Sequence, residues 1–453
     1  MANLLTHSLT FSKESVTEYF IKPLFSDSDV RQIVSVRTDI KSSEKIDFVG
    51  NLEYITKAYA QGTSFTPSTG VTVTQKTLTV YGLKAEVQQN GKAFLNWVKQ
   101  ELLKKGVDEN NISGTIFEQI VMELFMKGIK NDLVRQMFFG DMTAETLTNT
   151  GGLYSPSGTA DTRYNVYQGF WPRIIDAYDS SLISSAQLLD INVVTTYQTT
   201  AAVKGKKTIT MTGTSGTANV PINGVNYLFT FDTDLTTSCA NFATAHAATI
   251  AARMGKCVVT ASGATIIVEA GIPGMNVLIG AAVNVSGNAA SSGVATTTAA
   301  VKNTTLVSGG ANAIFQAMWD KMTPELREYV GKGLQFYVTT SVGDNFMKTL
   351  EALNGSEVAY TNLVNGQRQL NFRGIPINIR QDWDVRIAND GGGIRPHRAL
   401  LTIPENLWIG TDGSSDDTNV ELFYDQVTQN NVFRVEYKAG TQFAHEKLFV
   451  AAY

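Results

Sequence analysis

The sequence predicts an α+β protein that carries an inserted β-rich module. Three patterns support this class. Apolar and polar residues alternate over 71–83 and again over 432–437, which is typical of strands, whereas apolar residues recur at helical spacing over 117–138. The third pattern is a stretch over 208–301 that is nearly free of charge and is rich in turn residues and short strands. The segments on either side of this stretch read as one continuous mixed domain, so we predict an insertion.

The composition narrows the possible functions. A chain of 453 residues exceeds what one hydrophobic core organises, and 43% hydrophobic with 17% charged residues is typical of folded proteins. The formal net charge of −4 argues against binding nucleic acid through a broad basic surface. The first 16 residues lack the pattern of a secretory signal, and Glu269, Pro273 and Asn276 interrupt the most apolar run, 263–285. We therefore expect no membrane segment.

The N-terminal third predicts extended elements. Residues 1–38 form an arm with one short helix, which Ser12 caps and Pro23 ends. Residues 39–90 form a two-stranded excursion whose second strand is a single long one over 71–88. A hairpin of this length buries little apolar surface, so we expect neighbouring molecules to order it.

Two helices follow. Residues 90–106 are amphipathic, and Thr115 to Glu118 match a capping box that opens a rod of about 37 Å ending at Gly140. The sequence places Leu124 among the buried residues of the rod. The apolar positions near helical spacing are Phe117, Ile120, Val121, Leu124, Phe125, Ile129, Leu133, Met137 and Phe138.

The inserted stretch predicts a compact module. Strands are expected at 207–212, 218–222 and 225–231, with a turn at Asn223-Gly224, followed by an Ala-rich helix closed by Gly255 and a hairpin over 256–270. Insertions cost least at a loop tip, which is where we place this one. Its charged residues between Thr208 and Val301 are Asp232, Asp234, Arg253, Lys256 and Glu269.

Beyond the insertion the mixed pattern resumes. The predicted helices are 312–327 and 342–353, and the predicted strands lie within 334–341, 370–381, 398–411 and 431–453.

Catalytic patterns are lacking. No nucleotide-binding glycine motif, zinc-protease motif or nucleophile elbow occurs, and 203–210 lacks the spacing of a phosphate loop. The acidic loop 411–419 does not match a calcium loop and is interpreted as solvated. We predict no catalytic, cofactor-binding or metal-binding residue. The four histidines, which lie far apart and belong to no visible constellation, are His7, His246, His397 and His445.

Two cysteines make no disulfide framework. Cys239 and Cys257 both lie in the inserted stretch, so one bridge stays open as an alternative, but buried free thiols are the preferred reading.

The order of elements resembles that of the major capsid proteins of tailed phages, the Hong Kong 97-type fold. The resemblance rests on the arm, the long hairpin, the rod helix, the mixed region and the final strands ending in EYKAGTQFAHEKLFVAAY. It implies the following division: N-arm 1–38, E-loop 39–90, peripheral (P) domain with spine helix 91–150, axial (A) domain 151–200, inserted surface domain 201–302, A-domain again 303–384 and P-domain strands 385–453.

The resemblance also implies a function. It predicts a non-enzymatic shell protein that self-assembles as hexamers and pentamers around phage DNA, in the host cytoplasm and then in the virion. A separate scaffold, a portal and a decoration protein are its implied partners, and DNA contacts would be weak and non-specific. Lys57 and Lys76 lie in the E-loop, but single lysines do not predict covalent cross-linking. An encapsulin-type compartment and a phage tail or adhesive protein are the alternatives.

The resemblance also offers a reason for the low charge of the insertion. On a shell, the module would project outward beside identical copies, and a nearly uncharged surface reduces their mutual repulsion. Thr, Ser and Asn keep such a surface wettable.

Overall fold

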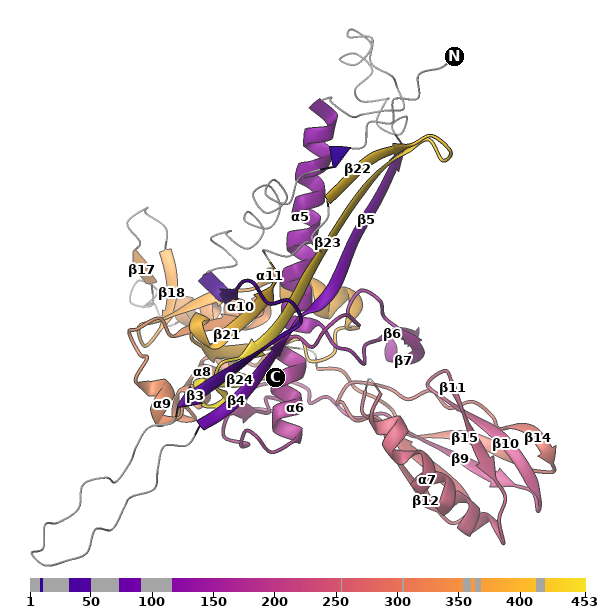
Figure 1. Cartoon of the computed structure of the whole chain (residues 1–453). Helices are drawn as coiled ribbons and strands as arrows, with labels where there is room; N and C mark the ends of the chain where they lie inside the picture. The colour runs from indigo at the N-terminus through magenta and orange to yellow at the C-terminus, as the bar shows by residue number, and fades with distance from the viewer. Residues whose placement is uncertain are drawn as a thin grey trace, which may run out of the picture. The chain divides into compact units, whose positions relative to one another are not determined.

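The computed structural model describes residues 9–10, 32–49, 73–90, 116–253, 255–303, 305–352, 360–362, 368–412 and 420–453. Helices and sheets are mixed, so the predicted α+β class is confirmed (Figure 1). The chain divides into two compact units, Met1–Lys130 with Leu407–Ala444, and Asn131–Asn406 with His445–Tyr453. They are called the first and second unit below.

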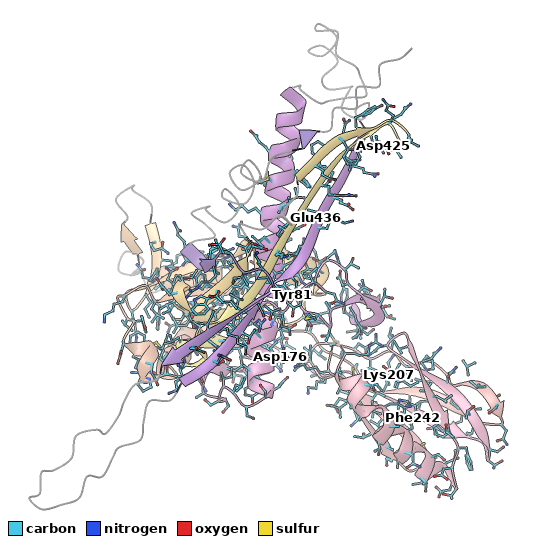
Figure 2. All side chains as sticks on the ribbon, in the orientation of Figure 1. Tyr81, Asp176, Lys207, Phe242, Asp425 and Glu436 are labelled. Carbon is cyan, nitrogen blue, oxygen red and sulfur yellow. The ribbon has the colours of Figure 1, made fainter. Side chains whose placement is uncertain are left out.

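The first unit is organised by one long strand, β23 (Asn430–Phe443). On one side it pairs over ten residues with β5 (Tyr81–Asn90), and on the other side with β22 (Val420–Asp425) and β21 (Leu407–Thr411). Strands β1 (Leu9–Thr10) and β2 (Ser35–Arg37) complete the sheet in the order β1-β22-β23-β21-β2. Figure 2 places Asp425 at the turn that joins β22 to β23, and Tyr81 at the other end of β5.

The predicted long strand over 71–88 is wrong in one respect, because it is two strands in two sheets. Strand β4 (Val73–Thr79) pairs with β3 (Ser43–Val49), whereas β5 joins β23. The chain changes partner at Val80, which is buried with Leu78 and Ile40. The hairpin base therefore has its own small core, and the ten residues of β5 are paired within the unit rather than awaiting neighbours.

The predicted rod is helix α5 (Ile116–Phe139). From Phe125 onward, buried positions recur at helical spacing, as the sequence predicted for Phe125, Ile129, Leu133, Met137 and Phe138. Leu124 was wrongly placed among them, because its side chain is 61% exposed. Apolar spacing alone does not distinguish the buried stripe of a helix from a single apolar residue beside it.

The main sheet of the second unit has seven strands. Their order is β17-β18-β19-β16-β20-β24-β8, with parallel pairing for β16–β19 and β24–β8 and antiparallel pairing elsewhere. Strands from both sides of the expected boundary at 384/385 share this sheet. The strands are β8 (Leu188–Leu189), β16 (Gln335–Val338), β17 (Tyr360–Asn362), β18 (Arg368–Phe372), β19 (Ile375–Ile379), β20 (Ala399–Thr402) and β24 (Phe449–Ala452).

Helices cover this sheet and fill its core. Phe315 of α8 and Phe346 of α10 stack with Phe336 and Phe372 of the strands, with ring centroids 4.9–6.1 Å apart. Apart from α5 and the helix of the charge-poor stretch, the described helices of the unit are α6 (Phe170–Asp179), α8 (Gly310–Asp320), α9 (Pro324–Arg327), α10 (Thr340–Ala352) and α11 (Gln381–Val385), with the π-helix η4 (Arg386–Asp390) and the 3-10 helices η5 (Pro404–Asn406) and η6 (Glu446–Leu448).

The charge-poor stretch (pink in Figure 1) folds around a core of its own residues, to which Ile394 is added from outside. Helix α7 (Leu235–Ala251) packs on a four-stranded sheet, β12-β13-β9-β15, and a three-stranded sheet, β11-β10-β14. The Asn223-Gly224 turn is confirmed, with φ of 46° and 78°. The strands are β9 (Lys206–Thr212), β10 (Gly216–Ile222), β11 (Val225–Thr230), β12 (Val258–Ser262), β13 (Thr265–Glu269), β14 (Val283–Gly287) and β15 (Ala290–Thr298).

The chain enters and leaves this segment through a paired neck. Val203 and Val301 exchange two backbone hydrogen bonds of 2.8 and 3.1 Å, and the Thr199 N–H donates to the Thr305 carbonyl at 3.0 Å. Below the neck, the Asn303 amide donates to the buried Gln198 at 2.5 Å. The two crossings are therefore held side by side.

Some expectations lie outside the described residues. These are most of the N-terminal arm, the helix over 90–106, the tip of the hairpin with Lys57, and most of the acidic loop 411–419. Among the described helices, none is both long and apolar enough to cross a membrane.

Candidate functional site

Three histidines lie in described parts of the chain, in three different settings. The His246 ring packs 4.7 Å from Phe242 and 5.4 Å from Tyr227, with Nε2 2.9 Å from the Leu228 carbonyl oxygen. His445 caps η6, where its Nδ1 accepts from the Lys447 N–H at 3.2 Å. Both side chains contribute to local structure, His246 by ring packing and His445 as a cap.

His397 has a side-chain partner that the sequence did not reveal. Its Nδ1 lies 2.8 Å from the Ser341 hydroxyl, at the start of α10, and the ring is 4% exposed. Burial lowers the pKa of His397 to about 4, so the ring is neutral near pH 7. Nucleophilic catalysis by a Ser–His pair needs a third group to orient the imidazole, but Nε2 has no partner among the described residues. The nearby carboxylate of Asp384 instead accepts from the Thr340 N–H at 2.9 Å. The pair is a buried hydrogen bond between α10 and the segment before β20.

The two cysteines are free and buried, which confirms the preferred reading. Burial raises the pKa of Cys239 to about 11, and it also raises that of Cys257, whose sulfur accepts from the Asn223 amide at 3.4 Å. Both thiols are protonated near pH 7, which does not suit a reactive nucleophile. Within the described residues no cluster of His, Cys, Asp and Glu is arranged to hold a metal ion.

The second unit also contains a buried aromatic hub at the C-terminal end of α5. Its rings touch edge to face, with the Trp383 centroid 4.9 Å from Phe138, 5.4 Å from Trp171 and 6.1 Å from Phe139. Phe170 completes it, 5.6 Å from Phe138. Edge-to-face pairs add about 0.5–1.5 kcal/mol each beyond the apolar area they bury. The hub joins α5, α6 and α11.

Two glycines allow the elements of the hub to meet. The Gly169 N–H donates to the Gly140 carbonyl at 2.7 Å, just where α5 ends and α6 begins. A Cβ on Gly169 would lie 2.8 Å from the Gly140 nitrogen and 2.7 Å from the Gln136 carbonyl oxygen. Any side chain at this position would force the two helix ends apart. The close approach of the two helix ends therefore requires glycine at both positions, Gly140 and Gly169.

Arginines surround the hub. The Arg398 guanidinium lies 5.1 Å from the Trp171 ring and 5.2 Å from that of Phe139, while Arg386 lies 5.9 Å from Phe139 and 3.7 Å from Tyr164. Burial lowers the pKa of Arg398 to about 9 and lowers that of Arg386 as well. Cation–π contacts and the negative end of the α5 dipole offset part of this desolvation.

A carboxylate network closes the outer side of the hub. Arg163 donates to both oxygens of Asp161, at 2.9 and 2.8 Å, and to Asp390 at 2.5 Å, while the Tyr164 hydroxyl donates to Asp390 at 2.5 Å. Burial alone would raise the pKa of Asp161, but the hydrogen bonds from Arg163 lower it overall. Such a network holds Arg163, Tyr164, Asp161 and Asp390 in one arrangement.

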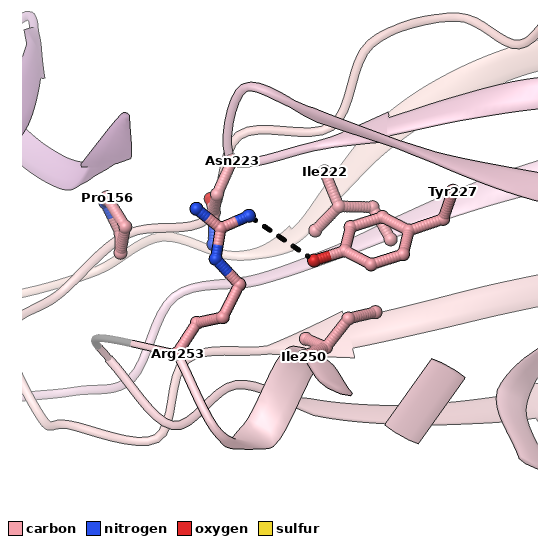
Figure 3. Close-up of a pocket in the computed structure, with 6 residues that line it drawn as sticks. All are labelled: Pro156, Ile222, Asn223, Tyr227, Ile250 and Arg253. Atoms are coloured by element: carbon pink, nitrogen blue, oxygen red, sulfur yellow. Dashed lines mark hydrogen bonds between the residues drawn. The ribbon is translucent and has the colours of Figure 1, made fainter. Parts of the chain in front are cut away.

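The root of the inserted segment is a second polar cluster, and Figure 3 shows two of its members, Arg253 and Tyr227. Arg253, just after α7, donates from Nε to Glu145 at 2.7 Å, and its terminal nitrogen lies 3.5 Å from the Tyr227 hydroxyl. Glu145 opens β6 (Glu145–Thr150), which pairs with β7 (Leu153–Ala160), and its second oxygen accepts from the Gly158 N–H at 2.9 Å. The hollow beside Arg253 is small, about 10 Å³, room for about one water molecule. This cluster seats the segment on the β6–β7 hairpin.

Replacing Glu145 with alanine should destabilise the second unit by about 3–5 kcal/mol, because it leaves the Arg253 charge half-buried without its partner. The measurement is a denaturant titration followed by intrinsic fluorescence. Glu145→Ala combined with Arg253→Met should recover much of the loss, since neither charge then remains. Equal losses in the single and double variants would contradict an ion-pair role.

The surface of the inserted segment includes two exposed, uncharged strands. All five residues of β14 and six consecutive residues of β15, 292–297, are exposed, and none is charged. Figure 2 marks Lys207, on β9, and Phe242, whose side chain reaches the core from α7. Sequence reasoning identified the low charge but not β14 and β15.

No protein-family model and no curated protein sequence matches the chain. Solved structures similar to it include the procapsid of satellite phage P4 with its size-determination protein, at 9% identity and a TM-score of 0.44, covering 96% of this chain and 98% of that one. The capsid of cyanophage P-SCSP1u matches at 12% identity and a TM-score of 0.37, covering 93% and 86%. The capsid of Ralstonia phage GP4 matches at 8% and 0.36, also covering 93% and 86%. At these values no functional residue is transferred from them.

Proposed function

We propose that the chain is a major capsid protein of a tailed phage with the Hong Kong 97-type fold, which assembles as hexamers and pentamers into an icosahedral shell around DNA. The observation that carries the proposal is the length and order of the longest described helix and the longest described strand. The 24-residue helix α5 and the 14-residue strand β23 serve as long single supports, and they occur in the order the resemblance requires.

The rigidity of the supports favours a building block over a catalyst. Strand β23 is paired along its whole length by β5, β21 and β22, and α5 ends in the aromatic hub. A shell subunit must hold its shape so that many copies meet at repeatable angles, and buried aromatic packing with charge networks serves that need.

Two parts of the division suggested by the resemblance are proposed in revised form. The E-loop is the β3–β4 hairpin, and β5 belongs with the P-domain strands because it pairs with β23. The A-domain includes β20 and β24, because both lie in the seven-stranded sheet. The other divisions are proposed as expected, with the insertion facing outward and a separate scaffold and portal as partners.

Electron microscopy of the purified protein in negative stain tests the proposal. Large icosahedral shells are expected. Uniform small shells would favour an encapsulin-type compartment, and tubes or monomers under all assembly conditions would favour the tail or adhesive alternative. A chain that never forms closed shells, with or without a candidate scaffold protein, would overturn the proposal.

We also propose that the inserted segment is an independent domain. Its core is built mainly from its own strands and α7, with Ile394 as a buried residue from outside, and its ends meet at the neck. Residues 201–302 expressed alone should therefore melt in one cooperative transition, followed by circular dichroism. A non-cooperative profile would show that the segment needs the seat at Glu145 to fold.

A further inference from the structure

Strand β15 is an unprotected sheet edge. It pairs with β9 on one side, and among the described residues no strand lies on its other side. Natural proteins guard such edges with charged residues, proline or a covering segment. The nine residues of β15 include neither charge nor proline, and six consecutive residues are exposed.

The edge has a short regular stretch. The register with β9 shifts between Ser291 and Gly293 and again between Thr296 and Thr298, which leaves Gly293 to Thr296 regularly paired. Bulges limit how much of an edge a further strand can use. A contact built on this stretch would involve few hydrogen bonds and would be weak in a single pair of molecules.

We propose that the β15 edge pairs antiparallel with the β15 edge of a second copy of this chain. Two identical strands related by a two-fold axis are complementary by symmetry. An edge that recognises a foreign partner gains specificity from charge, whereas an uncharged edge meets its own copy without like-charge repulsion. The inference rests on the proposed shell, in which two-fold axes can relate copies of adjacent capsomers, and in which many such weak contacts act together.

The exposed, uncharged surface of strand β14 also favours a second copy of this chain as the partner. All of β14 is exposed, and its Val283 and Val285 side chains are 61% and 54% exposed. The whole stretch from Ala270 to Val301 carries no charge. Identical surfaces of this kind approach each other without the repulsion that net charge would create.

The test places one charge on the edge of the full-length chain. Ala295→Lys sets two lysines against each other across the proposed contact, and Ala245→Lys places the same charge on an exposed position of α7 as a matched control. Shells of Ala295→Lys should break up at a denaturant concentration at which wild-type and Ala245→Lys shells survive. Shells of equal resistance would overturn the inference.

A cross-linking measurement covers the case in which the charged variant fails to fold. Paired Cα atoms across antiparallel strands lie about 4.5–5.5 Å apart, within reach of a disulfide. Val294→Cys and Ala295→Cys, separately and combined, should yield oxidised dimers in shells, whereas Ala245→Cys should not; Cys239 and Cys257 are buried. No dimer from any edge variant would overturn the pairing.

Two further outcomes separate this inference from the proposed function. If wild-type protein forms no shells, sedimentation of the free chain still reports the contact, as self-association that Ala295→Lys abolishes and Ala245→Lys preserves. If Ala295→Lys shells keep their resistance but lose a bound decoration protein, the edge serves that protein and the pairing of copies is wrong.

Discussion

Replacing Trp383 with alanine is expected to lower the free energy of unfolding by about 3–5 kcal/mol and to abolish shell formation. The side chain is fully buried, and its ring contacts Phe138, Phe139 and Trp171. Its loss would leave a cavity among these rings, which adds to the cost of the lost apolar contacts. A loss of this size is a large share of a typical domain stability of about 5–15 kcal/mol.

Differential scanning calorimetry of the subunit and particle counts by microscopy measure the two effects. Leu124→Ala is the matched control in the free subunit, because this exposed residue lies on the same helix as Phe138. Its melting temperature should stay close to wild type. If Leu124→Ala were as damaging as Trp383→Ala, or if Trp383→Ala left the melting temperature unchanged, the hub would not hold the unit together.

Acid should destabilise the second unit through His397. Burial lowers the pKa of His397 from its ordinary value of 6.5 to about 4. The unfolded chain therefore binds a proton between these two values while the folded chain does not, so stability is full above about pH 6.5 and falls as the pH drops towards about 4. At about 1.4 kcal/mol for each pKa unit, the loss approaches about 3 kcal/mol.

The measurement is the free energy of unfolding at several pH values for the wild type and for His397→Asn, which keeps an acceptor for Ser341. Both proteins share every carboxylate, so the difference between them isolates His397. The stability of the wild type should fall relative to the variant between pH 6.5 and 4, and the difference should be constant above pH 7. Parallel curves throughout would mean that the ring is protonated in the folded chain or accessible to water.

Local patterns in the sequence predicted local structure well. The rod, the Asn223-Gly224 turn and most strands were predictable, because helical spacing, turn residues and alternation act between near neighbours in the chain. Which strands pair with one another was not predictable. Nothing local shows that the chain switches from β3 to β23 at Val80, since the alternation continues through both strands.

The hub was hidden for the same reason. Phe138 and Trp383 are distant in the sequence, and each alone reads as an ordinary apolar residue. The pairing of Ser341 with His397 was missed because it too depends on where the seven-stranded sheet brings distant segments. Leu124 shows the opposite error. Its apolar spacing along the helix predicted a buried residue, but the folded chain leaves its side chain exposed.

Because the paired neck holds its two ends together, the inserted segment could be removed or replaced by another segment. Val203 and Val301 are already hydrogen-bonded neighbours, so a tight turn could replace everything between them with little movement of the flanking chain. Any foreign domain whose ends lie as close together could be grafted there on the same terms. In evolution this junction would let a lineage gain, lose or swap the inserted segment while the rest of the chain stays under separate selection. For protein engineers, the same position is a ready site for displaying an antigen or a binding domain.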